Sequence, residues 1–311
     1  MKVRGRRKPA KRCRDRPQGA FGGLAENISI PVPPRIPWIW LDRLQMKYCR
    51  FQFNGQPQYG LVEAVAGRDS IVRILLTAPE EADGDLESLR TRRIEAIPLE
   101  EAVLLPPVRP SKIVCIGRNY REHAVELGHD VPTEPLIFLK ATSALLPPGG
   151  VVRRPKISQN VHYEGELGVV IGRTCYQPPA DADIRQFILG YTCVNDVTAR
   201  DLQNKDGQWS RAKGFDTFCP VGPLVIDEID PWAGLGVQTK VNGETKQDGN
   251  TRDFLFALDV VIRHIAQAMT LFPGDLIPTG TPAGVGPVVA GDVMEVTVEG
   301  VGTLRNVVAD E

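Results

Sequence analysis

Alternating apolar and polar positions predict a small β-rich module in the first third of the chain. The alternation runs through residues 48–53, a turn signal follows at Asn54-Gly55, and a second alternating run covers residues 59–65. Every second side chain of a strand points to the same face, and Asn-Gly favours the tight turn of a hairpin. We therefore expect a small β-rich module over residues 46–108.

The remaining residues, 109–311, carry more strand patterns than helix patterns. Short apolar runs that predict buried strands cover residues 112–116, 167–171, 191–194 and 293–298. Only residues 252–269 have apolar side chains spaced for a long helix with one buried face. Glycine and proline, at 30 and 26 residues, indicate many turns. The pattern predicts a strand-dominated α+β domain without internal repeats.

The first 45 residues differ in composition from the rest. Lysine and arginine occur nine times within residues 1–16, and residues 30–37 are rich in proline. A basic tail of this kind is typical of RNA binding or of organelle targeting, but the basic run contains no serine and forms no clear amphipathic helix. We expect a disordered extension over residues 1–45, and Met46 is a candidate for the true start of the protein.

Composition and charge restrict the class of partner. Net charge is -1 and charged residues make up 24% of the chain, so no global field attracts nucleic acid or an acidic membrane. No apolar run approaches the roughly 18 residues that a membrane-spanning helix needs. Six cysteines are widely spaced without a C-x-x-C pair, which is typical of buried thiols in a reducing compartment. These features predict a cytoplasmic protein whose partner is a small molecule, with no nucleic acid and no membrane.

Two glutamates separated by one residue are the most informative acidic feature. Glu164 and Glu166 lead into a β-branched strand pattern, where positions i and i+2 share a face. Gly165, on the other face, indicates close packing against the backbone. Asp196 ends the neighbouring strand pattern 191–195. Three carboxylates without Cys or His ligands favour Mg²⁺ or Mn²⁺, with Ca²⁺ as a further option. The alternative is a solvated strand face.

A histidine and a glutamate share one face of a short predicted helix. Asn119 has the character of an N-cap and Gly128 that of a helix stop, which predicts about two turns over residues 119–128. His123 and Glu126 stand three positions apart and therefore meet on this helix. A carboxylate beside an imidazole orients the ring and raises its basicity, as a general base requires. The alternative is a surface ion pair.

Seven stretches of the chain form a distinctive set. They are Gly-Arg-Asn-Tyr-Arg-Glu-His (117–123), Glu-Pro-Leu-Ile-Phe-Leu-Lys (134–140), His-Tyr-Glu-Gly-Glu-Leu-Gly (162–168), Asn-Asp-Val-Thr-Ala-Arg-Asp-Leu-Gln (195–203), Ala-Lys-Gly-Phe-Asp (212–216), Lys-Val-Asn-Gly-Glu (240–244) and Pro-Thr-Gly-Thr-Pro-Ala-Gly (278–284). Together they resemble the fumarylacetoacetate hydrolase family, in its branch of acylpyruvate hydrolases, oxaloacetate decarboxylases and hydroxymuconate isomerases. The stretches occur in the family's order, and their conjunction is far more specific than any one of them. The resemblance implies a catalytic domain of rolled mixed β-sheets over residues 109–311, a homodimer, and Mg²⁺ or Mn²⁺ as cofactor.

The resemblance also implies a role for individual residues. It places the divalent cation on the acids singled out above, Glu164, Glu166 and Asp196. It assigns His123 and Glu126 to a mobile lid and Lys213 to catalysis. Side chains expected at the substrate are Arg118, Tyr120, Lys140, Arg200, Gln203 and Thr281. For His162, which adjoins the acids, it implies packing and not the role of base.

The family resemblance implies an enzyme that acts on a small 2-oxo acid. We expect hydrolysis of a carbon-carbon bond in a 2-oxo or 1,3-dioxo acid, of the acylpyruvate or fumarylpyruvate type. The alternatives are decarboxylation of oxaloacetate and isomerisation of a hydroxymuconate-type diacid in aromatic catabolism, which need no attacking water. A non-catalytic metabolite-binding protein is a third option, and the presence of the acids, both lysines and the His-Glu pair speaks against it.

Overall fold

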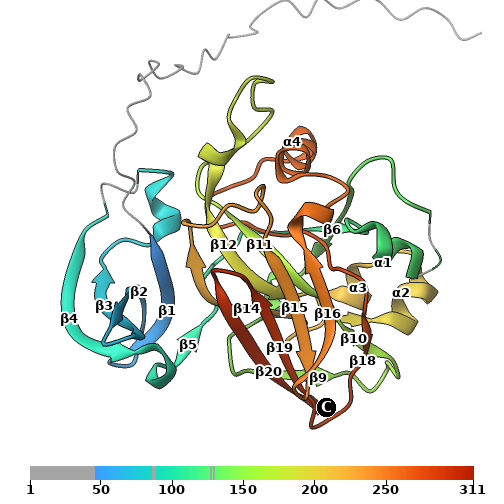
Figure 1. Cartoon of the computed structure of the whole chain (residues 1–311), viewed down its shortest axis with the longest axis horizontal. Coiled ribbons are helices and arrows are strands. Elements are labelled where there is room, and N and C mark those ends of the chain that lie inside the picture. Colours follow the sequence, from blue (N-terminus) through green and yellow to red (C-terminus); the bar gives the residue numbers. More distant parts are fainter. Residues whose placement is uncertain (1–45, 86–88, 127, 129) are drawn as a thin grey trace, which may run out of the picture. The chain divides into compact units, whose positions relative to one another are not determined.

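A large mixed sheet is the main element of the structure (Figure 1). The computed structural model describes residues 46–85, 89–126, 128 and 130–311, so the expectations for residues 1–45 lie outside the described residues. The twelve strands of the sheet, in their spatial order, are β4 (Thr91–Pro98), β3 (Arg68–Leu75), β2 (Gln56–Val65), β1 (Lys47–Phe53), β14 (Cys219–Ile226), β12 (Ile188–Asn195), β11 (Gly165–Ile171), β17 (Leu276–Pro278), β6 (Ile113–Gly117) and β7 (Leu136–Lys140), with β5 (Leu104–Leu105) on β1 and β8 (Leu145–Leu146) on β14. The β17–β6 and β14–β8 pairs are parallel, whereas the other pairs are antiparallel.

Two smaller sheets and four α-helices complete the described part of the chain. One sheet contains β13 (Thr198–Ala199), β10 (Val161–Tyr163) and β18 (Gly286–Pro287), and the other β16 (Glu244–Asn250), β15 (Gly236–Val241), β19 (Val293–Val298), β20 (Gly302–Asp310) and β9 (Val151–Arg154). The α-helices are α1 (Arg121–Glu126), α2 (Arg200–Asp206), α3 (Ser210–Lys213) and α4 (Leu258–Ala268). Short 3₁₀ turns lie at Pro79–Ala82, Leu99–Glu101, Thr142–Ala144, Ile184–Phe187 and Thr251–Asp253. This strand-dominated architecture confirms the predicted fold class.

The predicted hairpin near the start of the chain is present. β1 and β2 pair antiparallel from Tyr48↔Leu61 to Phe53↔Gln56, and Asn54 and Gly55 both have positive φ, of 51° and 75°. Two positive φ values are what a type I′ hairpin turn requires. β1 also pairs with β14, so one sheet contains strands from both predicted domains.

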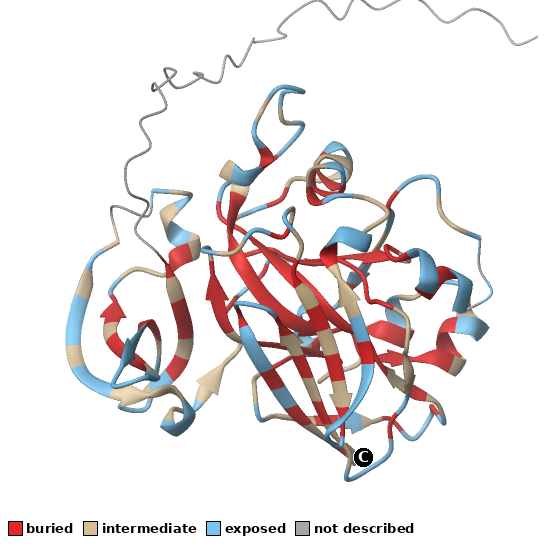
Figure 2. Cartoon of the chain, in the orientation of Figure 1, coloured by how far each residue is buried: buried red, intermediate tan, exposed pale blue. Residues whose placement is uncertain are grey.

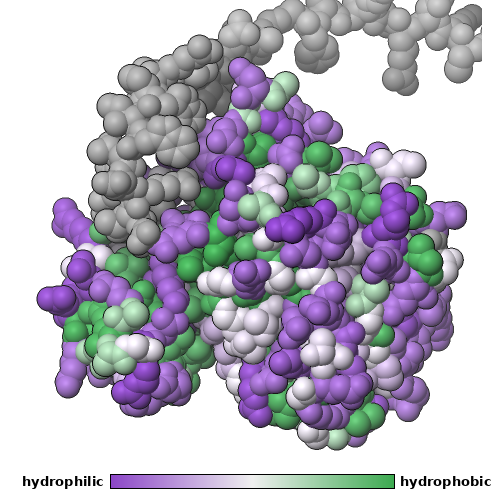
Figure 3. Space-filling model, viewed as in Figure 1, coloured by the Kyte–Doolittle hydropathy of each residue, from purple (hydrophilic) through white to green (hydrophobic). Residues whose placement is uncertain are grey.

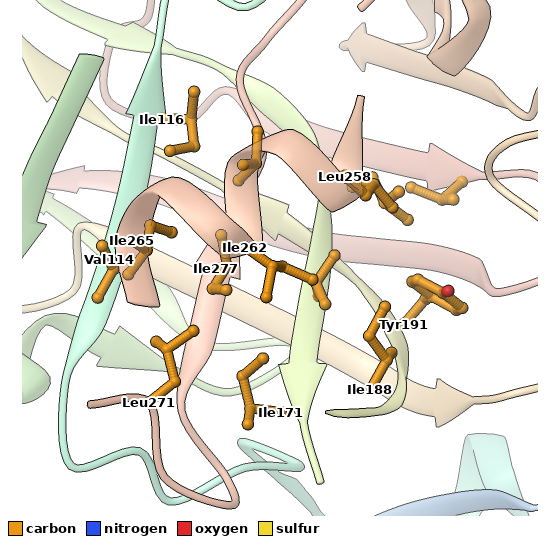
Figure 4. Packing of buried hydrophobic residues seen from close by; sticks show 14 of the residues in the cluster. Val114, Ile116, Ile171, Ile188, Tyr191, Leu258, Ile262, Ile265, Leu271 and Ile277 are labelled. Atoms are coloured by element: carbon orange, nitrogen blue, oxygen red, sulfur yellow. The ribbon is translucent and has the colours of Figure 1, made fainter. Parts of the chain in front are cut away.

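The centre of the large sheet is buried on both faces. Every residue of β11 and β12 is buried, as the red ribbons in Figure 2 show. β15 and β19 of the five-stranded sheet pack against β11 on one side. On the same face of the sheet, Leu258, Ile262 and Ile265 of α4 pack against Val114, Ile171 and Ile277, which come from β6, β11 and β17 (Figure 4). The opposite face, with Val170 of β11 and Val194 of β12, belongs to a second buried cluster that includes Met46 and Tyr48.

The long helix begins later than predicted. α4 starts at Leu258, whereas the apolar spacing predicted a start at residue 252. The backbone N–H groups of Leu255 and Phe256 donate to the carbonyl and the side-chain oxygen of Asn119, and this tertiary contact holds residues 254–256 outside the helix. Local periodicity gives no information about such a distant partner.

The surface and the thiols match an ordinary globular chain. Hydrophilic residues, interspersed with smaller hydrophobic patches, cover the face shown in Figure 3. Within the described residues, no helix is long and apolar enough to cross a membrane. The five cysteines of the same part of the chain, Cys49, Cys115, Cys175, Cys193 and Cys219, are free and buried. Their burial agrees with the sequence-based prediction of buried thiols.

Candidate active site

Three buried carboxylates meet where β11 begins and β12 ends. Glu164 immediately precedes β11, Glu166 lies inside it, and Asp196 follows β12. The antiparallel pair Gly165↔Asn195 brings these positions together, and one oxygen of each acid lies within 4.8 Å of the others. We call Glu164, Glu166 and Asp196 the acid cluster. The sequence-based prediction that these three acids converge therefore agrees with the structure.

Gly165 allows a close approach of the second sheet to the acid cluster. A Cβ at this position would lie 2.0 Å from Oγ1 of Thr239 on β15 and 3.2 Å from Val296 on β19. The Gly165 N–H donates to the buried side chain of Gln247 at 2.9 Å, and its carbonyl accepts from Thr281 at 2.9 Å. These contacts fix the backbone between the two glutamates, in accord with the close packing that the glycine predicted.

Three cationic side chains bond to the acid cluster. Lys213 Nζ donates to Glu164 at 2.8 Å and to Asp196 at 2.5 Å, while Lys140 Nζ donates to Asp196 at 2.6 Å. Arg200 donates to the other oxygen of Glu164. Burial works against the charge of Lys213, but Asp196 and Glu164 outweigh burial and raise its pKa. The lysine is therefore a permanent cation at this site.

The two glutamates of the acid cluster have opposite pKa shifts. Burial alone would raise the pKa of Glu164, yet Lys213 and Arg200 hold it well below its usual range. Glu166 accepts from the Gly280 N–H at 2.7 Å and bonds to no cationic side chain of the described residues, so burial, followed by the charges of Asp196 and Glu164, raises its pKa well above the usual value. A divalent cation among the three carboxylates would offset the repulsion and the burial that raise the pKa of Glu166. The hard, all-oxygen donor set with one uncompensated acid fits Mg²⁺ or Mn²⁺.

A cavity of about 280 Å³ opens over the acid cluster. Glu164 and Asp196 form part of its wall, and α1, α2 and α3 contribute side chains to it; Figure 1 shows these helices grouped together. The lining residues are Gly117, Arg118, His123, Phe138, Glu164, Asp196, Arg200, Gln203, Asn204, Gly207, Trp209, Lys213 and Thr281. A volume of this size suits a small organic acid.

His123 on α1 lines this cavity as a neutral imidazole. The ring is 4% exposed, and burial lowers its pKa below the usual 6.5, although Glu164 and Glu126 work in the opposite direction. Nδ1 faces Glu126 Oε2 at 3.4 Å, which leaves Nε2 as the nitrogen that can accept a proton. Glu126 also accepts from the Gly284 N–H at 3.0 Å, so α1 is attached to the loop that carries Thr281.

Other predicted site residues divide into two groups. Arg118, Arg200, Gln203 and Thr281 line the cavity. Lys140 and Tyr120 do not belong to the residues that line it: Lys140 is buried behind Asp196, and Tyr120 packs edge-on against Phe254 with its hydroxyl buried and without a hydrogen-bond partner among the described residues. Lys140 therefore supports an acid, whereas the sequence assigned it to the substrate.

Hydrogen bonds determine what two of the lining side chains can offer a ligand. Gln203 accepts from Arg200 at 2.6 Å through its oxygen, so its amide N–H groups are the donors left for a ligand. Thr281 donates its only hydroxyl proton to the Gly165 carbonyl and accepts from Gln247 at 2.7 Å. Thr281 can therefore accept a further hydrogen bond but cannot donate one.

Asn119 and His162 are two further residues near the site for which the sequence analysis made predictions. Asn119 is not the N-cap of α1; its side chain donates to the Thr279 carbonyl at 2.9 Å and accepts from the Phe256 N–H at 2.9 Å, so it joins three loops instead. His162 is half-buried, and its Nε2 lies 2.9 Å from Asn160 Oδ1. Burial and then Arg200 lower the pKa of His162 to about 4.

The sequence analysis did not identify the aromatic wall of the cavity. Phe138 and Trp209 form an edge-to-face pair with ring centroids 5.2 Å apart. Lys213 Nζ lies 4.9 Å from the Phe138 ring centroid, and Arg118 Cζ lies 5.6 Å from that of Trp209. The available signal was a tryptophan in an otherwise polar, glycine-containing loop, where an aromatic side chain has no local apolar partner.

Two known protein families match different parts of the chain. Residues 112–309, more than half of the chain, match the family described as fumarylacetoacetate (FAA) hydrolase C-terminal. The chain belongs to the fumarylacetoacetate hydrolase family. Residues 46–107 match a second family, described as Rv2993c-like, N-terminal. The resemblance found in the sequence is thereby confirmed.

Relatives of this family member carry the names of several kinds of enzyme. A 2,4-didehydro-3-deoxy-L-rhamnonate hydrolase of Sphingomonas sp. (strain SKA58) is 40% identical over 280 residues, which cover 85% of this chain and 96% of that protein. Oxaloacetate tautomerase YisK of Bacillus subtilis (strain 168) is 40% identical over 222 residues, which cover 67% and 73%. A crystal structure of 2-hydroxyhepta-2,4-diene-1,7-dioate isomerase from Mycobacterium marinum has a TM-score of 0.76 and 40% identity, covering 86% and 99%.

Proposed function

We propose that this fumarylacetoacetate hydrolase family member hydrolyses a carbon-carbon bond in a 2-oxo or 1,3-dioxo acid of the acylpyruvate or fumarylpyruvate type, with Mg²⁺ or Mn²⁺. One observation carries the proposal. A buried acid cluster and a neutral imidazole with its own carboxylate partner border the same small cavity. Hydrolysis of such a bond needs both parts, because electrons must be accepted at one end of the substrate while water attacks the other.

Glu164, Glu166 and Asp196 would hold the cation, which when bound supplies Lewis-acid stabilisation of the negative charge that develops on the 2-oxo group. Lys213 bonds to two of these acids at once and offsets the repulsion between them. Arg200 orients Gln203, whose amide donors face the substrate carboxylate. The enolate that leaves thus forms in a site rich in fixed donors, which need no reorganisation when the charge develops.

His123 prepares the water that attacks the distal carbonyl. With Nδ1–H directed at Glu126, Nε2 takes a proton from water, and the imidazolium that forms is stabilised by the Glu126 carboxylate. Glu126 also holds α1 to Gly284 at the rim of the cavity. Addition of the hydroxide to the distal carbonyl gives a tetrahedral intermediate, whose collapse breaks the carbon-carbon bond and releases a carboxylic acid and the enolate of the 2-oxo acid. The imidazolium then returns its proton to the enolate carbon.

A second reaction class uses the same acid cluster without an attacking water. Relatives named as an oxaloacetate tautomerase and as a dienedioate isomerase support this alternative, which comprises tautomerisation, isomerisation or decarboxylation of oxaloacetate or of a hydroxymuconate-type diacid. The homodimer and the cytoplasmic location expected from the sequence remain predictions.

A substrate panel tests the proposed function. Acylpyruvates, oxaloacetate and hydroxymuconate-type diacids are each incubated with the purified chain and Mg²⁺ or Mn²⁺. We expect fastest turnover of an acylpyruvate of the fumarylpyruvate type, loss of turnover in excess chelator, and recovery when either metal is added back. Turnover of oxaloacetate or of the diacid alone would favour the second reaction class, and full turnover in chelator would contradict the metal-dependent mechanism.

A further inference from the structure

Arg118 occupies a strained position at the rim of the cavity. It follows β6 with a φ of 56°, in the left-handed region that a long, branched side chain rarely adopts. The residue before it, Gly117, approaches Trp209 so closely that a Cβ would lie 2.7 Å from the indole ring. Strained backbone of this kind concentrates at ligand clamps, where the surrounding structure holds a side chain in a useful direction.

Trp209 supports the guanidinium from one side. Arg118 Cζ lies 5.6 Å from the centroid of the indole ring, within the range of a cation–π contact. Trp209 in turn contacts Phe138, and Phe138 contacts Lys213. The aromatic pair therefore forms a continuous wall that leads from the acid cluster, which Lys213 contacts, to Arg118.

Arg118 has no anionic partner within the described residues. It takes part in no ion pair or hydrogen bond there, and its Nε is buried without a partner. Burial lowers the pKa of the Arg118 guanidinium, and the charge of Asp130 works in the opposite direction. A planar guanidinium presents several donors in a fixed fork that matches a carboxylate. The Arg118 guanidinium is oriented, unpaired among the described residues and part of the cavity wall, so it is suited to bind an anionic group of the ligand.

The charges around the acid cluster do not supply this anion. Three cations, Lys140, Lys213 and Arg200, equal its three carboxylates in number, and they bond to Glu164 and Asp196. A divalent cation would add two positive charges, and the head of a 2-oxo acid in its enolate form carries two negative charges. The positive charge of Arg118 then remains for a second anionic group on the substrate.

We infer that Arg118, held on the face of Trp209, determines specificity by binding a carboxylate at the far end of the substrate, so that this enzyme prefers 2-oxo dicarboxylates over 2-oxo monocarboxylates. This inference rests on the proposed function for the position of the 2-oxo head at the acid cluster. Trp209 acts as a positioning residue, because it contacts the guanidinium and not the distal carboxylate itself.

Equilibrium binding of two matched acids tests this inference. 2-Oxoglutarate and 2-oxopentanoate have the same five-carbon chain and differ only in a terminal carboxylate or methyl group, and oxalate probes the metal end alone. Calorimetry on the full chain with Mg²⁺ should give at least about tenfold tighter binding of 2-oxoglutarate than of 2-oxopentanoate, as expected for a charge-assisted contact. Arg118→Gln should reduce this ratio to about two or less, with the affinities for oxalate and 2-oxopentanoate unchanged.

Three further variants make the test specific. Arg118→Lys keeps the charge but loses the fork and should keep only part of the preference. Trp209→Leu removes the supporting ring and should also reduce the ratio. Arg121→Gln removes an exposed arginine three positions along that does not line the cavity, and it should leave the ratio at the wild-type value.

The outcomes separate this inference from the proposed function. If oxalate binds, three results would overturn the inference alone. They are equal affinity of the wild type for both acids, an unchanged affinity ratio in Arg118→Gln, and a reduction of this ratio in Arg121→Gln as large as that in Arg118→Gln. If neither oxalate nor either 2-oxo acid binds in the presence of Mg²⁺, the proposed function and the inference both fail.

Discussion

Replacement of His123 should affect hydrolysis far more than decarboxylation. The imidazole is buried at the cavity, its lowered pKa keeps it neutral near pH 7, and Nε2 is the nitrogen not directed at Glu126. Positioned general-base catalysis contributes roughly 10²- to 10⁴-fold. His123→Ala should therefore reduce kcat/KM for an acylpyruvate by that factor, or about 2.7–5.4 kcal/mol of transition-state stabilisation. Decarboxylation of oxaloacetate needs no attacking water and should fall by less than about tenfold.

The assay compares both reactions in the same preparations. His123→Asn keeps most of the side-chain volume and tests whether a cavity left by alanine is responsible for the loss. His162→Ala is the matched control, because His162 is also an imidazole next to the acids but lies outside the residues that line the cavity. Equal loss of both activities with metal binding intact would refute the base assignment and leave His123 as a positioning residue.

The pH profile of hydrolysis provides a second readout of the same base. A general base must be deprotonated, and burial lowers the pKa of His123 below 6.5. Activity should therefore rise with pH through an apparent pKa below 6.5 and stay constant between that value and neutral pH. An apparent pKa above 7 in kcat/KM would contradict the environment described for His123.

Three further perturbations have defined outcomes. Lys213→Met leaves Glu164 and Asp196 without their shared cation and should lower the free energy of unfolding of the metal-free protein by about 3–5 kcal/mol in urea titrations. The control Lys246→Met, at an exposed ion pair, should change this free energy by less than about 1 kcal/mol, and equal effects of the two variants would contradict the account. Gly165→Ala should cost about 1–3 kcal/mol by the same measurement, because the new Cβ meets Thr239, and no loss would show that the two sheets are not closely apposed there. Hydrogen exchange at residues 121–126 should slow when oxalate and Mg²⁺ are added, since so short a helix is marginal by itself, and unchanged exchange would indicate a fixed helix.

Patterns local in sequence predicted the strands and the acids well. β19 was placed at its observed bounds, and the β1–β2 hairpin followed from one Asn-Gly signal. Glu164 and Glu166 are two positions apart, so strand periodicity alone put them together. Asp196 needed a further assumption, that its strand pairs next to that of the glutamates, and this pairing is present.

Contacts between distant segments were beyond the reach of the sequence. The apolar spacing from residue 252 predicted a helix. Asn119, which is distant in sequence, accepts hydrogen bonds from the backbone N–H groups of residues 255 and 256 and holds them outside the helix. Lys140 was expected at the substrate, because nothing in its own strand reveals that Asp196 lies in front of it. The Arg118–Trp209 contact joins residues 91 positions apart and depends on a strained backbone angle that composition does not encode.

Metal binding to the acid cluster tests the central claim most directly, and Glu166→Gln is the most selective variant for this purpose. Within the part of the chain that the structure describes, Glu166 bonds to no cationic side chain, and burial raises its pKa, so amide replacement should leave the metal-free fold intact. Titration calorimetry with Mn²⁺ should show one site in the wild type and in Glu126→Gln, a rim variant. Glu166→Gln should weaken this site by more than about 100-fold, since even the loss of a side chain that only contacts a metal ligand costs about 10- to 100-fold. Unchanged Mn²⁺ affinity in Glu166→Gln would contradict the assignment of the acid cluster as the metal site.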